Sequence, residues 1–445
     1  MLNRLKRAPF LLLLALLGGV PFVIGAEPPS FAHEHSDIQP DPAIRFGKLP
    51  NGLRYAIAAN AEPKGRASLR LLVEAGSLHE TEEQRGLAHF LEHMAFNGSV
   101  HYPPGTLIEF FQRMGMNFGG DTNASTSFDR TLYLIELADT KDATLAEGFR
   151  VFSDYAGGLL LQPAELDRER GIILSEKRAR DSVSFRTFVA QFEQLLGSTL
   201  FPKRMPIGLT EVIEKSPREQ FVDFYDAWYR PELISIVAVG DFEVDAIEKL
   251  IVSTFPPLKA RAPAKPQPDL GKIVTTPGVH AYFHAEPESP NTSIGISSLF
   301  PHSFEPDTVG NRTKDLPRSL AHAMINRRFR ILAKKENAPF LSASASVAEQ
   351  FDFFREASVD LTAKAEHWEA ALAVGEQELR RARTYGFQQN ELDEVRANFI
   401  NGLEQAVKTA PTRRSPALAG EIANDILRKN VSSHPQTDLE IYKPA

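Results

Sequence analysis

The sequence predicts an α+β protein of two related domains, and three observations lead to that fold class. The chain has 445 residues, which is long for one ordinary domain. Hydrophobic residues make up 42% of it and charged residues 24%, the balance of a soluble globular protein rather than a disordered one. Short strand patterns alternate with longer helical patterns, and the second half repeats the order of the first without obvious sequence identity.

The first 26 residues are predicted to be a secretory signal peptide. Arg4, Lys6 and Arg7 form a basic opening, an apolar run covers 10–20, and small residues lead to Ala26. A membrane anchor is the alternative, but the apolar run is shorter than the ~20 residues that a spanning helix needs. We therefore expect cleavage after Ala26 and no membrane association of the mature protein.

The first domain is predicted at 43–257, after a polar, proline-containing segment at 27–42 that we expect to be flexible. Two alternating strands flank a Pro-Asn-Gly turn, and a β-branched run near the end of the domain suits a buried strand. Strands are predicted within 45–60 (two), 67–77, 116–137 (two) and 233–242. Helices are predicted to begin near 87 and 103 and to cover 141–161, 163–180, 184–200, 218–231 and 244–254.

A proline- and lysine-rich linker is predicted at 258–272, and a second domain at 273–445. Its strands are predicted at 278–285, 292–300, 340–349 and 354–364, and its helices at 315–335, 367–385 and 389–407. The first domain ends with a buried strand and a closing helix, whereas the second shows neither. Either the repeat is degenerate or the chain ends before the second domain is complete, and we favour the second alternative.

Charge and cysteine content exclude several classes of function. The net charge is −7 and the chain has no basic stripe interleaved with aromatic residues, so a nucleic-acid partner is not expected. The absence of cysteine excludes disulfides, thiolate metal ligands and a cysteine nucleophile. An exported protein without cysteine fits the bacterial periplasm, with secretion as the alternative.

The segment "RGLAHFLEHMAFNGS" (85–99) places His89, Glu92 and His93 on one face of a helix. Two imidazoles one turn apart can bind the same divalent ion, and the glutamate beside the second one can reach a water on that ion. The order H-x-x-E-H is a signature of one group of zinc proteases. The alternative is a pair of half-buried histidines in an amphipathic helix, and hydrophobicity does not decide between the two.

A third protein ligand is expected, because catalytic zinc sites normally have three. Glu169 and Glu176 are two helical turns apart and share a face. The apolar residues 172–174 would bury this part of their helix. The alternative is that both carboxylates pair with neighbouring basic residues on the surface, and spacing leaves the choice open.

Three runs together resemble the pitrilysin family of zinc metallopeptidases, which includes insulin-degrading enzyme. They are "HFLEHMAFNGS", "GGDTNASTSFDRTLY" and "ERGIILSEKR". The likeness is greatest to periplasmic bacterial members; it covers about 45–255 by motif and the rest only by element order. It implies two related α/β-sandwich domains, each a mostly antiparallel sheet packed with helices, of which the first is catalytic and the second non-catalytic.

The resemblance also implies roles for individual residues. His89, His93 and Glu176 would bind one zinc ion per chain, and Glu92 would activate water and later protonate the leaving amine. Glu169 would steady a ligand histidine through a hydrogen bond.

The expected activity is that of a zinc endopeptidase or oligopeptidase acting on extended, unfolded peptides. A strand edge would hold the peptide by β-augmentation, which depends little on sequence. The residues expected along that edge are Gly119, Gly120, Asn123, Ala124 and Thr126. The alternative is a non-catalytic or half-enzyme subunit that binds peptides and needs a partner half.

One departure from the family pattern supports that alternative. The distal half of the family supplies an arginine and a tyrosine, seven residues apart, that clamp the substrate. The equivalent stretch "LAKKENAPFLSAS" has Ala333 and Phe340 at these positions. The chain thus resembles a proximal half, and we expect a distal half or partner subunit to supply the clamp.

Overall fold

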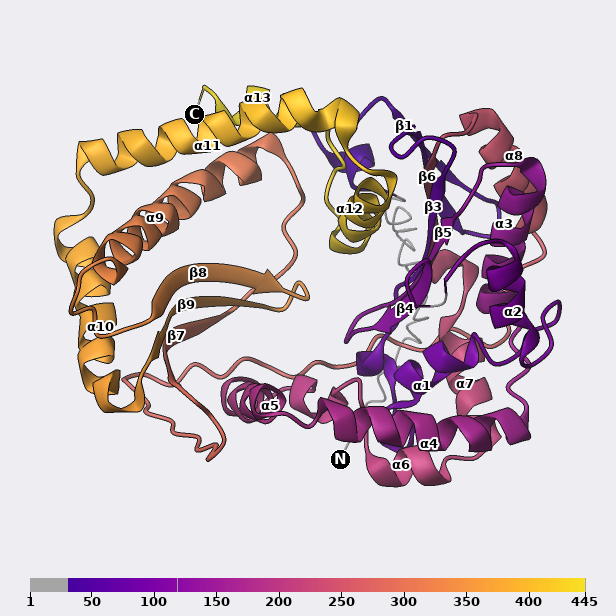
Figure 1. Ribbon diagram of the computed structural model, residues 1–445, viewed down its shortest axis with the longest axis horizontal. Helices are drawn as coiled ribbons and strands as arrows, with labels where there is room; N and C mark the ends of the chain where they lie inside the picture. The colour runs from indigo at the N-terminus through magenta and orange to yellow at the C-terminus, as the bar shows by residue number, and fades with distance from the viewer. Residues whose placement is uncertain (1–30, 118, 445) are drawn as a thin grey trace, which may run out of the picture.

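The computed structural model describes residues 31–117 and 119–444, and the predicted signal peptide lies outside them. The described chain forms two lobes, each with one β-sheet and helices packed against it (Figure 1). The predicted α+β class is therefore confirmed. None of the helices in the described residues is long and apolar enough to cross a membrane.

Six strands form the sheet of the first lobe, in the order β1-β2-β6-β3-β5-β4. They are β1 (Ile44–Lys48), β2 (Arg54–Ala59), β3 (Ala67–Val73), β4 (Thr122–Thr126), β5 (Thr131–Leu137) and β6 (Ile234–Gly240). β2 and β6 run parallel, and every other neighbouring pair is antiparallel. The β1–β2 turn contains Gly52, whose φ of 97° is a left-handed conformation that glycine adopts without strain. All strands predicted in this half are present.

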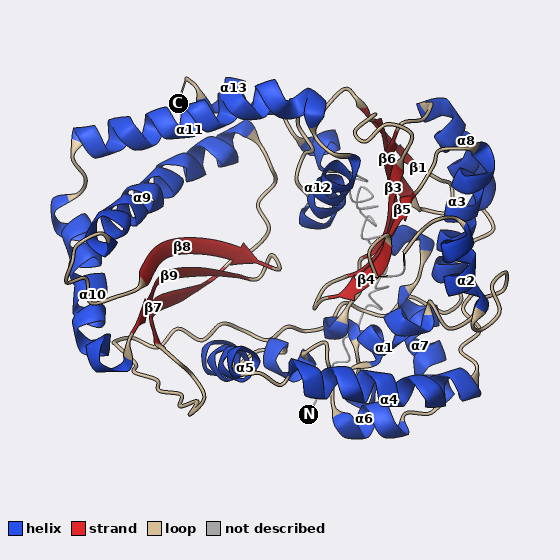
Figure 2. Ribbon diagram, in the orientation of Figure 1, coloured by secondary structure: helices blue, strands red, loops and turns tan. Residues whose placement is uncertain are grey.

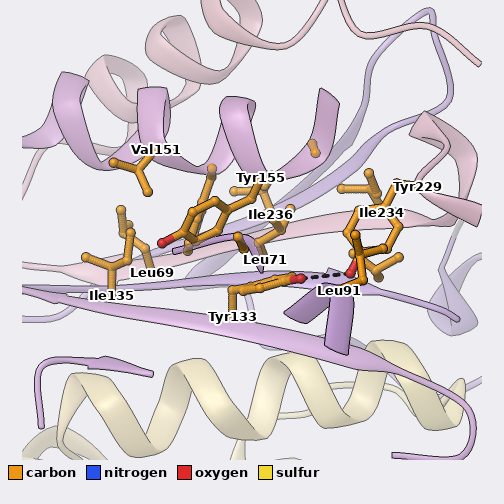
Figure 3. Packing of buried hydrophobic residues seen from close by; sticks show 14 of the residues in the cluster. Leu69, Leu71, Leu91, Tyr133, Ile135, Val151, Tyr155, Tyr229, Ile234 and Ile236 are labelled. Carbon is orange, nitrogen blue, oxygen red and sulfur yellow. Dashed lines mark hydrogen bonds between the residues drawn. The ribbon is translucent and has the colours of Figure 1, made fainter. Parts of the chain in front are cut away.

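Helices α1, α3, α7 and α8 cover one face of this sheet and enclose the main core (Figure 2). The helices of this lobe are α1 (Leu87–Met94), α2 (Thr106–Arg113), α3 (Asp142–Gly157), α4 (Pro163–Arg180), α5 (Val183–Leu196), α6 (Thr210–Lys215), α7 (Arg218–Trp228) and α8 (Val244–Thr254). Within the core, the hydroxyls of Tyr133 and Tyr229 hydrogen-bond to each other at 2.7 Å (Figure 3). These two polar groups are thus satisfied where burial would otherwise be costly.

The other face of the first sheet is covered by α12 (Ser415–Arg428), from the C-terminal part of the chain. Ala419 and Ile422 belong to one buried cluster with Leu72 of β3 and Val237 of β6. We expected all of 273–445 to belong to a second domain. The packing of α12 on the first sheet corrects this expectation for residues 415–428. The sequence predicted no helix at 415–428, and an apolar helix face does not by itself indicate which sheet will bury it.

The N-terminal segment is also ordered where the structure describes it. Phe31 and Ile38 are buried, and Phe31 joins the cluster beneath α12. The Ser36 hydroxyl donates to the carbonyl of Asp307 at 2.5 Å, which ties the segment to the second lobe. The expected flexibility of 27–42 is therefore wrong from Phe31 onward, because its few apolar residues occupy buried positions.

The second lobe has a three-stranded antiparallel sheet in the order β7-β9-β8. Its strands are β7 (Thr292–Pro301), β8 (Ser342–Gln350) and β9 (Phe354–Ala363), and its helices are α9 (Val309–Ala333), α10 (Trp368–Tyr385), α11 (Gln389–Thr409) and α13 (Pro435–Tyr442). α9 and α10 pack on one face of the sheet around Phe329, Leu361 and Ala371.

One strand predicted in this lobe is absent. Residues 278–285 have no regular structure, and the side chains of Val279 and Phe283 are 99% and 85% exposed. Their alternating apolar pattern predicted a strand, but a strand forms only where a neighbour pairs with it. No strand of the described chain lies beside them.

The two lobes meet through a cluster of phenylalanines. Phe351, in the turn between β8 and β9, stacks near Phe201 and Phe128 of the first lobe, with ring centroids 4.8 and 5.6 Å away. Beside them Arg428 of α12 pairs with Asp129 at 3.2 Å. The predicted linker at 258–272 runs along the first lobe, where Leu270 accepts a backbone hydrogen bond from Leu200.

Candidate metal centre

Helix α1 carries three of the predicted site residues. It begins after Gly86, which has a φ of 107°. The buried carboxyl group of Glu80 accepts the backbone N–H groups of Gly86 and Ala88 at 3.0 and 2.8 Å and so satisfies the first turn of the helix. On the helix, His89 and Glu92 are both buried.

Helix α4 supplies the two carboxylates. Ile173 is fully buried and α4 packs against α1, which fixes the face that α4 presents to the histidines. Glu169 and Glu176 lie on that face, two turns apart. Both carboxylates reach the histidines of α1. Of the two alternatives that the spacing left open, this position agrees with a role at the metal site rather than with surface ion pairs alone.

Glu176 lies between the two imidazoles. Its Oε1 is 3.6 Å from Nε2 of His89, and its Oε2 is 3.3 Å from Nε2 of His93. The imidazole rings are 4.8 Å apart and steeply inclined. One ligand atom from each of the three residues lies within 4.8 Å of the others. Two imidazole nitrogens and one carboxylate oxygen are a donor set that suits zinc.

Glu169 orients His93 from the other side of the ring. Nδ1 of His93 donates to Oε1 of Glu169 at 2.8 Å, which leaves Nε2 directed at Glu176. Oε2 of Glu169 accepts from the amide of Asn97 at 2.8 Å. Burial alone would lower the pKa of His93, but the hydrogen bond to Glu169 and the charges of Glu92, Glu169 and Glu176 outweigh it and raise the pKa.

His89 is in a different protonation state from His93. Burial, followed by the charges of His93 and Arg180, lowers the pKa of His89 to about 3, so its ring is neutral at physiological pH. Its Nδ1 is buried, and no described group hydrogen-bonds to it. A neutral imidazole whose Nε2 faces Glu176 has the protonation state that metal binding requires.

Glu92 faces the same space but has a different partner. Its Oε2 accepts a hydrogen bond of 2.6 Å from the hydroxyl of Thr126, at the end of β4. Burial raises its pKa. A buried carboxyl group with a raised pKa beside a possible metal site has the properties of a general base.

The segment expected to hold substrate lies at an edge of the first sheet. β4 pairs only with β5 among the described strands, so no strand of the described chain covers its other edge. On that edge the N–H of Ala124 donates to Oδ1 of Asn123 at 2.8 Å, and the carbonyl of Thr122 accepts from the N–H of Gly119 at 2.9 Å. Asn123 is exposed on β4 and donates to the carbonyl of Gly119 at 3.3 Å. Gly119 and Gly120 form the turn before the strand, and Ala124 is half-buried on it. Thr126 differs from the rest because its hydroxyl is bound to Glu92.

Three neighbours of the site were not predicted. Asn97 follows His93 by one helical turn, so helical spacing could have placed it near Glu169. Arg180 likewise follows Glu176 by one turn and pairs with it. Glu80 carried no such signal, because it reaches α1 from an irregular segment.

Comparison with known proteins gives two family matches. The model described as "Insulinase (Peptidase family M16)" matches residues 55–199, and that described as "Peptidase M16 inactive domain" matches residues 216–399. "Probable zinc protease PqqL" of Escherichia coli strain K12 is 28% identical over 411 residues, which are 91% of this chain and 43% of that protein. The protein of the same name from Haemophilus influenzae is 37% identical over 47% of this chain and 23% of its own length.

Solved structures agree with these matches. The first half of the periplasmic protease PqqL from Escherichia coli superposes with a TM-score of 0.85 at 27% identity, covering 92% of this chain and 87% of that one. The structure of the whole E. coli protease gives a TM-score of 0.84 at 28% identity, covering 91% of this chain but 45% of that one. The chain thus spans less than half the length of the curated relatives it matches.

Proposed function

The chain belongs to peptidase family M16, the insulinase family, and on that premise we propose that it is a zinc-dependent endopeptidase that hydrolyses extended peptides. The observation that carries the proposal is the convergence of His89, His93 and Glu176, from two separate helices, on one small space. A structural role would not require a buried and a half-buried imidazole to face the same carboxylate.

His89, His93 and Glu176 would hold the zinc ion, with Glu169 fixing the ring of His93. When bound, zinc would polarise the scissile carbonyl and lower the pKa of a nearby water to about 7. Glu92 would take a proton from the attacking water and deliver it to the leaving amine. Thr126 holds one oxygen of Glu92, which leaves the other free to receive that proton.

The edge of β4 away from β5 would bind the substrate as an added strand. Backbone hydrogen bonds would give most of the affinity, so the substrate must be extended, as in an unfolded peptide. Because Thr126 ends β4 and binds Glu92, a peptide on this edge would pass beside the general base.

We also propose that full activity needs a further half. Phe340, at the position where the family resemblance expects the clamp tyrosine, is buried in the second lobe with its ring 6.3 Å from that of Phe329. It therefore cannot reach a substrate on β4. If the 445-residue chain alone cleaves peptides as fast as the chain reconstituted with a partner half, this part of the proposal is wrong.

Export to the periplasm is proposed from the N-terminal signal pattern. The E. coli structures are described as those of a periplasmic protease, which agrees with this location.

The direct test is hydrolysis of quenched fluorescent peptides by purified wild-type protein and by Glu92→Gln. We expect the variant to lose activity by about 10²–10⁴-fold while keeping its zinc, because the general base is removed but the ligands remain. His93→Ala should lose both. Glu109→Gln, at an exposed position on α2, is the matched control and should keep wild-type activity. Cleavage by Glu92→Gln at the wild-type rate would contradict the assignment.

A further inference from the structure

Thr126 is the last residue of β4, and the backbone around it is held from two sides. It lies opposite Thr131 in the β4–β5 ladder. Directly after it, the N–H of Ser127 donates to the carbonyl of Arg130 at 2.9 Å, and the carbonyl of Ser127 accepts from the N–H of Ser77 at 3.0 Å. The place of Thr126 is therefore set both by the sheet and by the segment that precedes α1.

The side chain of Thr126 faces helix α1. Thr122 is buried, and Ala124 and Thr126 are half-buried. Asn123, which lies between the first two, is exposed. Because successive side chains of a strand point to opposite faces of the sheet, the even-numbered residues share the face of β4 that packs against α1. From this face the hydroxyl of Thr126 donates to Oε2 of Glu92 at 2.6 Å.

The backbone of Thr126 points in another direction, to the edge of β4 away from β5. The N–H of Ser127 bonds to Arg130, and the carbonyl of Asp121 accepts from the N–H of Glu136 at 2.7 Å, both on the side of β5. Backbone bonding alternates between the two edges of a strand, so odd-numbered residues of β4 bond to β5. Thr126 is thus the last residue of β4 whose N–H and C=O groups face the edge proposed for the substrate.

The contact between Thr126 and Glu92 matters because a glutamate does not fix its own carboxyl group. The last torsion of its side chain has broad energy minima, so neighbouring groups decide how the two oxygens are oriented. Among the described residues, Thr126 makes the one hydrogen bond to this carboxyl group, which is buried with its residue only 6% exposed. Two simpler roles remain for comparison: a direct contact with substrate, or satisfaction of a buried group without effect on catalysis.

We propose that Thr126 is a positioning residue, whose hydroxyl orients the carboxyl group of Glu92 while its backbone pairs with the substrate. The inference rests on the proposed role of Glu92 as general base. A single residue then sets the distance between a bound peptide and the group that takes the proton, much as Glu169 sets the ring of His93. The hydroxyl should affect turnover and not affinity, since the peptide would bond to the backbone.

Thr126→Val tests the role, because valine keeps the branched shape that suits a strand but has no hydroxyl. Crystal structures of the metal-free variants show the result directly. We expect the carboxyl group of Glu92 to move by about 1 Å or more, or to adopt several orientations, in Thr126→Val. It should keep its place in Thr126→Ser and in the control Ser125→Ala, which removes an exposed hydroxyl next in sequence. An unmoved carboxyl group in Thr126→Val would overturn the proposal.

Peptide hydrolysis separates positioning from substrate binding. We expect Thr126→Val to lower kcat by about 10–100-fold, with KM changed by less than about twofold and zinc content unchanged. Thr126→Ser and Ser125→Ala should keep wild-type constants. A raised KM at an unchanged kcat would identify Thr126 as a substrate contact and overturn the proposal. If the wild type cleaves no peptide, the proposed function fails, and the place of Glu92 in Thr126→Val still decides this inference.

Discussion

At the scale of single residues, the candidate centre combines side chains whose pKa values are shifted from their ordinary values. His89 is neutral because it is buried, with its pKa lowered to about 3, while His93 is surrounded by carboxylates that raise its pKa. Glu92 is buried with a raised pKa and a single hydroxyl partner, Thr126. Helical spacing predicted that His89, Glu92 and His93 share one face of a helix, because spacing of three or four residues is visible in the sequence. It did not predict the contact between Thr126 and Glu92.

The orientation of His93 can be tested apart from catalysis. Asn97→Ala should weaken zinc binding by about 10–100-fold, because Asn97 holds the carboxylate that fixes the ring of His93. Glu169→Gln should have an effect of similar size. Zinc affinity is measured by competition with a fluorescent chelator, and Gln112→Ala, exposed on α2, is the control. Unchanged affinity in both variants would show that the Glu169 contact does not position His93.

At the scale of elements, strands and helices with a strong period were predicted well, and those that depend on distant partners were not. The helix predicted at 244–254 has those bounds in the structure, because its apolar spacing and end signals are local. The strand predicted at 278–285 is absent because no neighbour pairs with it in the described chain. α12 was not predicted, since its place depends on a sheet formed more than 170 residues earlier.

Glu80, which binds the first turn of helix α1, should make the free energy of unfolding depend on pH. Burial raises the pKa of Glu80 to about 8, although the N–H groups of Ala88 and Gly86 oppose the shift. The folded protein therefore keeps a proton on Glu80 that the unfolded chain loses near pH 4.5. The contribution of Glu80 to the free energy of unfolding is full below pH 4.5 and is lost as pH rises towards about 8.

Glu80→Gln should remove this pH-dependent contribution. We expect the fall in unfolding free energy between about pH 5 and pH 8 to be smaller in the variant by on the order of 1–3 kcal/mol. Urea unfolding at the two pH values measures it, with the exposed Glu83→Gln as control. If wild type and Glu80→Gln lose the same free energy over this range, Glu80 does not titrate in it.

At the scale of the whole molecule, the second lobe contacts the first close to the candidate centre. The β8–β9 turn places Phe351 against Phe128, which follows Thr126 by two residues. Thr126 in turn holds Glu92. The sequence predicted two lobes from length and repetition, but it could not predict this contact, because no local pattern marks Phe351 as an interface residue.

Phe351→Ala should loosen this contact. We expect a loss of about 1–3 kcal/mol in unfolding free energy, below that of a fully buried phenylalanine because Phe351 is partly exposed. Urea unfolding measures it, and Phe300→Ala, at a side chain 48% exposed, should cost less than about 0.5 kcal/mol. Equal losses in the two variants would argue against a stabilising interface at the phenylalanine cluster.

The zinc content of the dialysed protein measures most directly whether side chains from α1 and α4 together form one zinc site. Mass spectrometry of the wild type and of Glu176→Gln, each checked for folding by circular dichroism, gives the number of ions per chain. We expect about one zinc ion per chain in the wild type and a large loss in a folded Glu176→Gln variant. Wild-type protein without zinc, or a variant that keeps its full content, would contradict it.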